Sequence, residues 1–219
     1  MQILDKERFS FTSHALGAGG AFIGMVVLLI MAVGDSVRST ITLVYGVSAV
    51  LMFTLSAAYH AKKREDDANT IWRKLDHLAI FIMIAGSYSI VSYFYLDWNL
   101  FFGITIAQWS LVFLGIFFTF FYISAPRFLS TLIYIVMGWL GAVFLKQLVS
   151  AMTPVRIAAL VGGGVLYTIG AIIYAKKKPD ILPDKIGFHG LFHLFILAAW
   201  AWHYYLVFVS MYDITRGGA

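Results

Sequence analysis

The charged residues of this chain divide it into seven long stretches that contain no Asp, Glu, Lys or Arg. These stretches cover residues 9–34, 39–61, 77–96, 98–126, 128–145, 157–175 and 186–212. Each holds at least 18 residues, which is enough for an apolar helix to cross a bilayer. The sequence therefore predicts an all-α, polytopic membrane protein in which residues 1–219 form a single domain of seven transmembrane helices.

The composition agrees with this prediction. Hydrophobic residues make up 61% of the chain and charged residues 12%, and the mean hydropathy is +0.84. Soluble domains have about 45–50% apolar and about 25% charged residues, so a soluble enzyme is excluded. The net charge of +5 has a simple origin in basic loops that fix topology, and no nucleic-acid partner is predicted.

The distribution of the basic residues predicts the orientation of the chain. Of the 16 Lys and Arg residues, 12 fall on the side of the membrane that holds the N-terminus. The other side holds Arg38, Lys146, Arg156 and Arg216. Because basic loops stay in the cytoplasm, we expect a cytoplasmic N-terminus and an outside C-terminus in a multi-pass protein of the plasma membrane.

Several ionisable residues are predicted to lie at one depth in the bilayer, where such residues are costly and mark candidate sites. His60 ends the second stretch on the cytoplasmic side, and Asp76 precedes the third on the same side. His189 and His193 lie about 6 and 12 Å beyond Lys185 at 1.5 Å per residue. Three segments that are distant in sequence therefore bring three imidazoles and a carboxylate to the same layer.

The spacing of these residues is typical of a metal site. His189 and His193 are four residues apart and share a helix face, as do Ser56 and His60. The chain has no cysteine, and three imidazoles with an open fourth position form the usual catalytic zinc site. Zinc lowers the pKa of the water bound to it to about 7. Asp76 is a candidate to orient that water or to act as general base.

Ser56 is a candidate to hydrogen-bond Asp76 or a substrate oxygen. The alternative interpretation is that the histidines are packed or water-bonded residues without a metal. The segment His189-Gly-Leu-Phe-His193 has Gly190 where a zinc protease has its catalytic Glu, which disfavours a protease.

The remaining histidines rank below the three candidate ligands. His77 follows Asp76 but points about 100° away on a helix, so we expect it to lie off the site. His14 is near the right layer and is a candidate partner behind the ligands, and His203 is expected to make a local hydrogen bond. Gly20 and Gly24 have the four-residue spacing that allows close helix packing.

Three segments of the chain together resemble the hemolysin III family, the bacterial branch of the progestin and adiponectin receptor superfamily. The matching segments are Ser56-Ala-Ala-Tyr-His60, Lys74-Leu-Asp76-His77 and Gly187-Phe-His189-Gly-Leu-Phe-His193. Their order and the seven stretches fit as well, so the resemblance covers nearly the whole chain. It implies the inner membrane of a bacterium.

The resemblance implies a Zn²⁺ site beneath the cytoplasmic surface with His60, His189 and His193 as ligands. It also implies that Asp76 holds the water at the metal and that Ser56 is a nearby polar partner. Eukaryotic relatives are associated with hydrolysis of ceramide amides and with lipid signalling. Gly190 departs from the Glu found there in many bacterial members, which puts a role for that position in doubt but leaves the ligands unaffected.

Three functions remain open from the sequence. The first is a zinc-dependent hydrolase of lipid amide or ester bonds, similar to a ceramidase, with membrane lipids as substrate. The second is a non-enzymatic, receptor-like or membrane-homeostasis protein with a structural zinc. The third, which the family name suggests, is a haemolytic pore former, but the stretches lack a charged stripe suited to a water-filled channel.

Overall fold

The structure is a computed structural model that describes residues 3–64, 70–122, 126–182 and 185–217. Within these ranges every regular element is a helix, and no strand is present. The helices in chain order are α1 (Asp5–Ala32), α2 (Ser36–Lys62), α3 (Ile71–Tyr95), α4 (Trp98–Phe121), α5 (Arg127–Trp139), the 3₁₀ helix η1 (Leu140–Phe144), α6 (Leu145–Ala151), α7 (Pro154–Lys176) and α8 (Gly187–Thr215).

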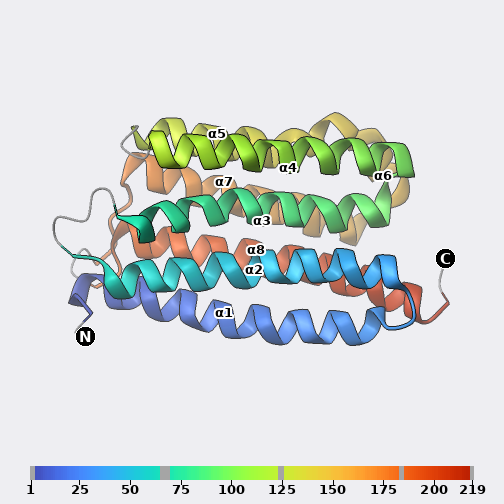
Figure 1. Cartoon of the computed structure of the whole chain (residues 1–219), viewed down its shortest axis with the longest axis horizontal. Coiled ribbons are helices and arrows are strands. Elements are labelled where there is room, and N and C mark those ends of the chain that lie inside the picture. Colours follow the sequence, from blue (N-terminus) through green and yellow to red (C-terminus); the bar gives the residue numbers. More distant parts are fainter. Residues whose placement is uncertain (1–2, 65–69, 123–125, 183–184, 218–219) are drawn as a thin grey trace.

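The described residues form seven spans that are long and apolar enough to cross a membrane, as the sequence predicts. Six spans are single helices, and the fifth combines α5, η1 and α6 over Phe128–Ala151. The spans run side by side, so the two ends of the chain lie at opposite ends of the bundle (Figure 1). Several helices extend past the charge-free stretches, and α1 begins at Asp5 rather than at residue 9.

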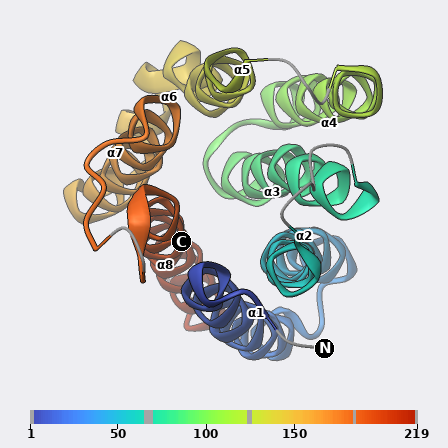
Figure 2. The ribbon, with the colours of Figure 1, turned by 90° about the vertical axis from the view of Figure 1, so that its left-hand side faces the viewer.

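Viewed along its length, the bundle is a ring of helices with α4 outside it (Figure 2). Helix α1 packs between α2 and α8, α2 packs on α3, and α7 packs on α8 and α5. Helix α4 packs mainly on the outer side of α3. Helices α1, α2, α3 and α8, which carry the candidate site residues, are therefore neighbours.

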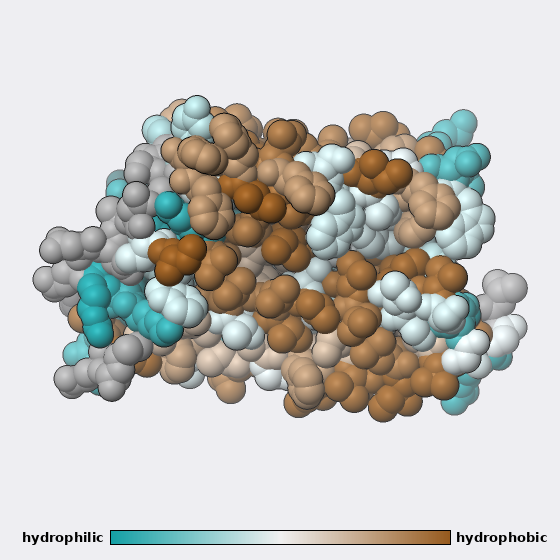
Figure 3. Space-filling model, in the orientation of Figure 1, coloured by the Kyte–Doolittle hydropathy of each residue, from teal (hydrophilic) through white to brown (hydrophobic). Residues whose placement is uncertain are grey.

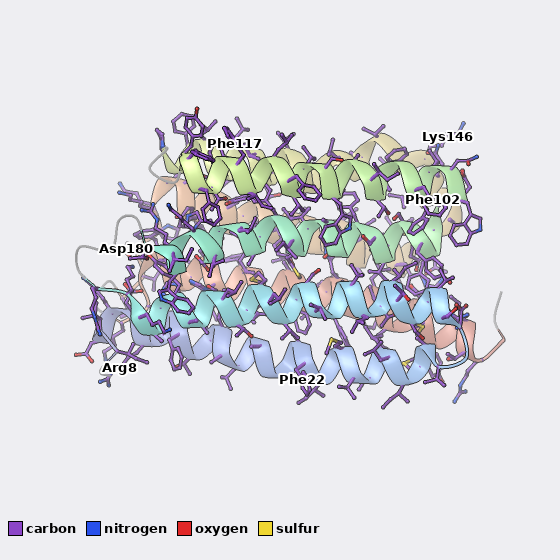
Figure 4. All side chains as sticks on the ribbon, viewed as in Figure 1. Arg8, Phe22, Phe102, Phe117, Lys146 and Asp180 are labelled. Carbon is purple, nitrogen blue, oxygen red and sulfur yellow. The ribbon has the colours of Figure 1, made fainter. Side chains whose placement is uncertain are left out.

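The face of the bundle in Figure 3 is mainly apolar along its middle, and polar residues gather at its two ends. Phe22, Phe102 and Phe117 project from α1 and α4 on this surface, and each is more than half exposed (Figure 4). Arg8 lies at the N-terminal end of the bundle and Lys146 at the opposite end (Figure 4). An apolar belt between two polar ends is the surface that a bilayer requires.

The fifth span departs from the uninterrupted helix that the sequence predicts over 128–145. The Tyr88 hydroxyl donates to the carbonyl of Gly138 at 2.7 Å and accepts from the backbone N–H of Gly141 at 2.5 Å. Nearby, the Gln108 side chain donates to the carbonyl of Met137 at 3.1 Å. These side chains satisfy backbone groups at the break, which is the condition for a non-helical turn inside a membrane bundle.

The close packing of α1 involves a different glycine pair from the one its sequence suggests. A Cβ atom on Gly24 would lie 2.7 Å from the ring of Tyr204, and one on Gly17 would lie 2.7 Å from Leu197. A Cβ on Gly20 would meet no atom within 4 Å. The prediction for Gly24 is confirmed and that for Gly20 is wrong, because Gly20 lies outside the buried face of α1.

We expect Gly24→Leu to destabilise the bundle by about 1–3 kcal/mol, the usual cost of forcing a side chain into a packed interior. Thermal unfolding in detergent, followed by fluorescence, measures this effect. Gly20→Leu is the matched control, since it makes the same change one helical turn away in open space. Equal melting temperatures for the two variants would contradict the packing of Gly24 against α8.

Candidate metal centre

Three histidines meet at the N-terminal end of the bundle. His60 lies in the last turn of α2, and His189 and His193 lie in the first turns of α8. One nitrogen from each ring lies within 4.8 Å of those of the other two, and the Nε2 atoms of His60 and His189 are 3.3 Å apart. His60 and His193 are buried and His189 is partly buried. The structure thus brings together the three predicted ligands.

The packing of α1 against α8 explains the glycine between the two histidines of α8. A Cβ on Gly190 would lie 2.8 Å from the ring of Phe9, in the first turns of α1. A larger residue at this position would therefore require the Phe9 ring to move. The glycine therefore suits the close packing of the Phe9 ring on the first turn of α8.

Asp76 and Ser56 lie on the walls of an internal cavity that also contacts His189 and His193. Asp76 is in the second turn of α3, and Ser56 is one turn before His60 on α2. The structure therefore places both predicted catalytic residues beside the histidine cluster. Their catalytic roles stay predictions.

The position of His77 on its helix suggests that it lies off the site, but the structure places it at the site. Its ring lines the same cavity as Asp76, and its Nδ1 is 3.6 Å from Oδ2 of that carboxylate. The same nitrogen donates to the carbonyl of Arg73 at 2.9 Å. The expectation is wrong because the cavity spans a wide arc of α3, so residues 100° apart can both face it.

The donor atoms of the cluster fit a zinc ion. The three groups are imidazole nitrogens, which zinc prefers together with thiolates and carboxylates. Nε2 of His193 is buried and has no hydrogen-bond partner among the described residues, although burying an unpaired polar atom is unfavourable. The cluster of mutually close donors contains these three histidines and no carboxylate of the described ranges. This arrangement can hold a metal with one coordination position free.

Glu7 is a residue of this centre that its sequence position alone does not single out. Its side chain is buried at the start of α1, its Oε2 is 2.6 Å from Nδ1 of His60, and its Oε1 accepts from Lys63 at 2.6 Å. A division of the chain at its charges places Glu7 outside the first span. Its spacing of seven residues from His14, which puts the two on one helix face, is the signal that could have found it.

The other two histidines lie where the sequence suggests. The ring of His14 contacts His193, whose Nδ1 is 2.6 Å from Nε2 and 2.9 Å from Nδ1 of His14. His203 donates from Nε2 to the carbonyl of Leu160 at 3.1 Å, which confirms its expected local hydrogen bond. His14 therefore lies against the histidine cluster without being part of it, and His203 lies far along α8 from it.

The cavity runs from the histidine cluster into the middle of the bundle and has a volume of about 170 Å³. Its walls come mainly from α3, α5, α7 and α8, with smaller contributions from α1 and α2, and they are mainly apolar, with Ile80, Ile84, Ile135 and Ile196 among them. Gly138 and His203 line its distant part. Asp76, Ser56 and the histidine cluster thus lie at one end of a long, mainly apolar space.

A family profile described as "Haemolysin-III related" matches residues 2–204. The chain belongs to this family. It is 31% identical over 208 residues to "Hemolysin-3" of Bacillus cereus, in a match that covers 94% of this chain and 92% of the relative. It is 32% identical over 215 residues to "Hemolysin-3 homolog" of Bacillus subtilis (strain 168), covering 94% and 95%. The family and the seven spans make this chain a multi-pass integral membrane protein.

We expect the detergent-purified protein to bind about one zinc ion per chain and His60→Ala and His193→Ala to lose it, since a three-ligand site does not tolerate removal of a ligand. Elemental mass spectrometry after zinc loading and dialysis measures the stoichiometry. His203→Ala is the control, because this buried histidine lies outside the cluster. Equal zinc contents in all four proteins would refute the site.

Proposed function

We propose that this protein is a zinc-dependent hydrolase that cleaves lipid amide or ester bonds, similar to a ceramidase. The observation that carries the proposal is a three-histidine cluster at one end of a mainly apolar cavity, in which Nε2 of His193 has no hydrogen-bond partner within the described ranges. Asp76 and Ser56 line the same end. This combination supplies ligands, a proton acceptor and a space for a hydrocarbon chain.

Each residue of the centre has a separate role in the proposed hydrolysis. His60, His189 and His193 would hold zinc, which supplies a Lewis acid that polarises a carbonyl and lowers the pKa of water. Asp76 accepts a proton from the attacking water while the water oxygen forms a bond to the acyl carbon. It returns that proton to the leaving nitrogen or oxygen when the amide or ester bond breaks. Ser56 is placed to hydrogen-bond Asp76 or a substrate oxygen.

The cavity supports a lipid as the substrate. Its mainly apolar walls match an acyl chain, whose scissile bond would then lie at the histidine end. Thr131 and Ile135 line both this cavity and a groove between α5 and α7. These two side chains mark the place where a lipid can pass sideways from the bilayer into the cavity. Apolar walls suit this role better than a water-filled pore.

To test the reaction, we expect Asp76→Asn to reduce turnover of a lipid amide or ester by about 100-fold or more, the usual contribution of an acid–base group. Product release from a panel of ceramides, acyl amides and acyl esters, measured by mass spectrometry, gives the rate. Zinc content should stay unchanged, because Asp76 is not part of the ligand cluster. Asp97→Asn, at the exposed start of α4, is the control.

Two outcomes would contradict the proposal. Zinc-loaded protein that cleaves no member of the panel but melts at a lower temperature without metal would assign zinc a structural role in a receptor-like protein. Turnover that survives in Asp76→Asn would show that the carboxylate does not handle the proton.

We infer that the metal centre faces the cytoplasm, since the basic residues gather at its end of the bundle. The chain has no cysteine, so single-cysteine variants report orientation without background. In spheroplasts, a membrane-impermeant thiol reagent should label Thr153→Cys and should label Lys6→Cys only after permeabilisation. Both positions are exposed, at opposite ends of the bundle. The reverse labelling pattern would place the centre outside.

A further inference from the structure

Helix α1 contributes two buried polar side chains to the metal centre, and neither belongs to the cluster of candidate ligands. Glu7 and His14 are two turns apart on the buried face of α1. Glu7 contacts Nδ1 of His60, and His14 contacts Nδ1 of His193. Each of the two fully buried candidate ligands therefore has one ring nitrogen occupied by a residue of α1.

These contacts engage Nδ1 of both rings and leave Nε2 as the nitrogen available to a metal. A carboxylate only accepts, so the proton between Glu7 and His60 comes from Nδ1 of His60. The neutral ring then carries its lone pair on Nε2, which lies 3.3 Å from Nε2 of His189. In His193, Nδ1 contacts His14, whose neutral ring can accept a hydrogen bond, and Nε2 is buried with no hydrogen-bond partner among the described residues.

The burial of Glu7 itself calls for a reason. A carboxylate is costly to bury unless it is paired, and Glu7 is 5% exposed in a helix that is otherwise mostly apolar. Lys63 at the end of α2 neutralises its Oε1, which leaves Oε2 to His60. Lys63, Glu7 and His60 thus form a continuous set of polar contacts from the polar end of the bundle to the histidine cluster.

We propose that Glu7 and His14 are positioning residues of the metal centre, which hold His60 and His193 in the tautomer and orientation that present Nε2 to the ion. The proposal rests on the zinc site inferred above. Residues that hydrogen-bond a metal-binding imidazole fix its tautomer and raise its basicity. Helix α1 is thus part of the centre although it supplies no ligand.

Zinc affinity, measured by competition with a chromogenic chelator, tests the proposal. Glu7→Leu removes the acceptor in similar volume, and Asp5→Leu is its control, because Asp5 is an exposed carboxylate in the same turn. His14→Leu is compared with His203→Leu, the same change in a buried histidine away from the centre. We expect about 10- to 100-fold weaker binding in Glu7→Leu and His14→Leu. The two controls should bind zinc as the wild type does.

The outcomes separate this proposal from the proposed function. Wild-type affinity in Glu7→Leu and His14→Leu would overturn the positioning role and leave the zinc hydrolase intact. A wild-type protein that binds no zinc would overturn both. Weaker binding in the two variants with unchanged melting of the zinc-free proteins would support positioning over a general loss of packing.

A second measurement needs no variant and guards against loss of folding. In wild-type protein labelled with ¹⁵N-histidine and loaded with ¹¹³Cd, nuclear magnetic resonance reports which ring nitrogen couples to the metal. We expect coupling to Nε2 and a protonated Nδ1 in both His60 and His193. Coordination of either ring through Nδ1 would overturn the proposal, because that atom is the one that faces α1.

Discussion

Burying an ionisable side chain inside a membrane bundle costs several kcal/mol unless the group finds a partner. Glu7, His14, His60 and His193 are all buried in the first or last turns of α1, α2 and α8. Their contacts with one another and with Lys63 draw these three helices together at one end. The position of α1 against α8 follows from the same requirement, with Gly17 and Gly190 allowing the close approach.

Different helices of the bundle form the histidine cluster and most of the cavity wall. Helices α1, α2 and α8 hold the histidine cluster, whereas α3, α5 and α7 form much of the wall of the apolar cavity. Asp76 lies where the two parts meet, next to His77 and across the cavity from α8. The histidine cluster and the apolar cavity are thus continuous, because His14, Ser56 and His193 also line the cavity.

The sequence predicts the seven spans and the histidine cluster for clear physical reasons. Gaps between charges locate the spans because charges are expelled from the bilayer core, and span order then fixes the depths of His60, Asp76 and His189. Placing every charge outside the spans misassigns Glu7, because the sequence does not distinguish a charge that is paired inside the protein from one that is exposed at a helix end. The break after Trp139 depends on Tyr88 from another helix, and the position of His77 depends on cavity width. Neither the break nor the position of His77 can be predicted from the local sequence.

X-ray absorption at the zinc K-edge of the loaded wild-type protein tests the central claim most directly. We expect three imidazole ligands with Zn–N distances of about 2.0–2.1 Å and one further oxygen, the pattern of an open site. A sphere of four imidazoles would contradict it, because His14 would then be a ligand and no position would remain for a substrate. A sphere of oxygen atoms alone would place the metal away from the histidine cluster altogether.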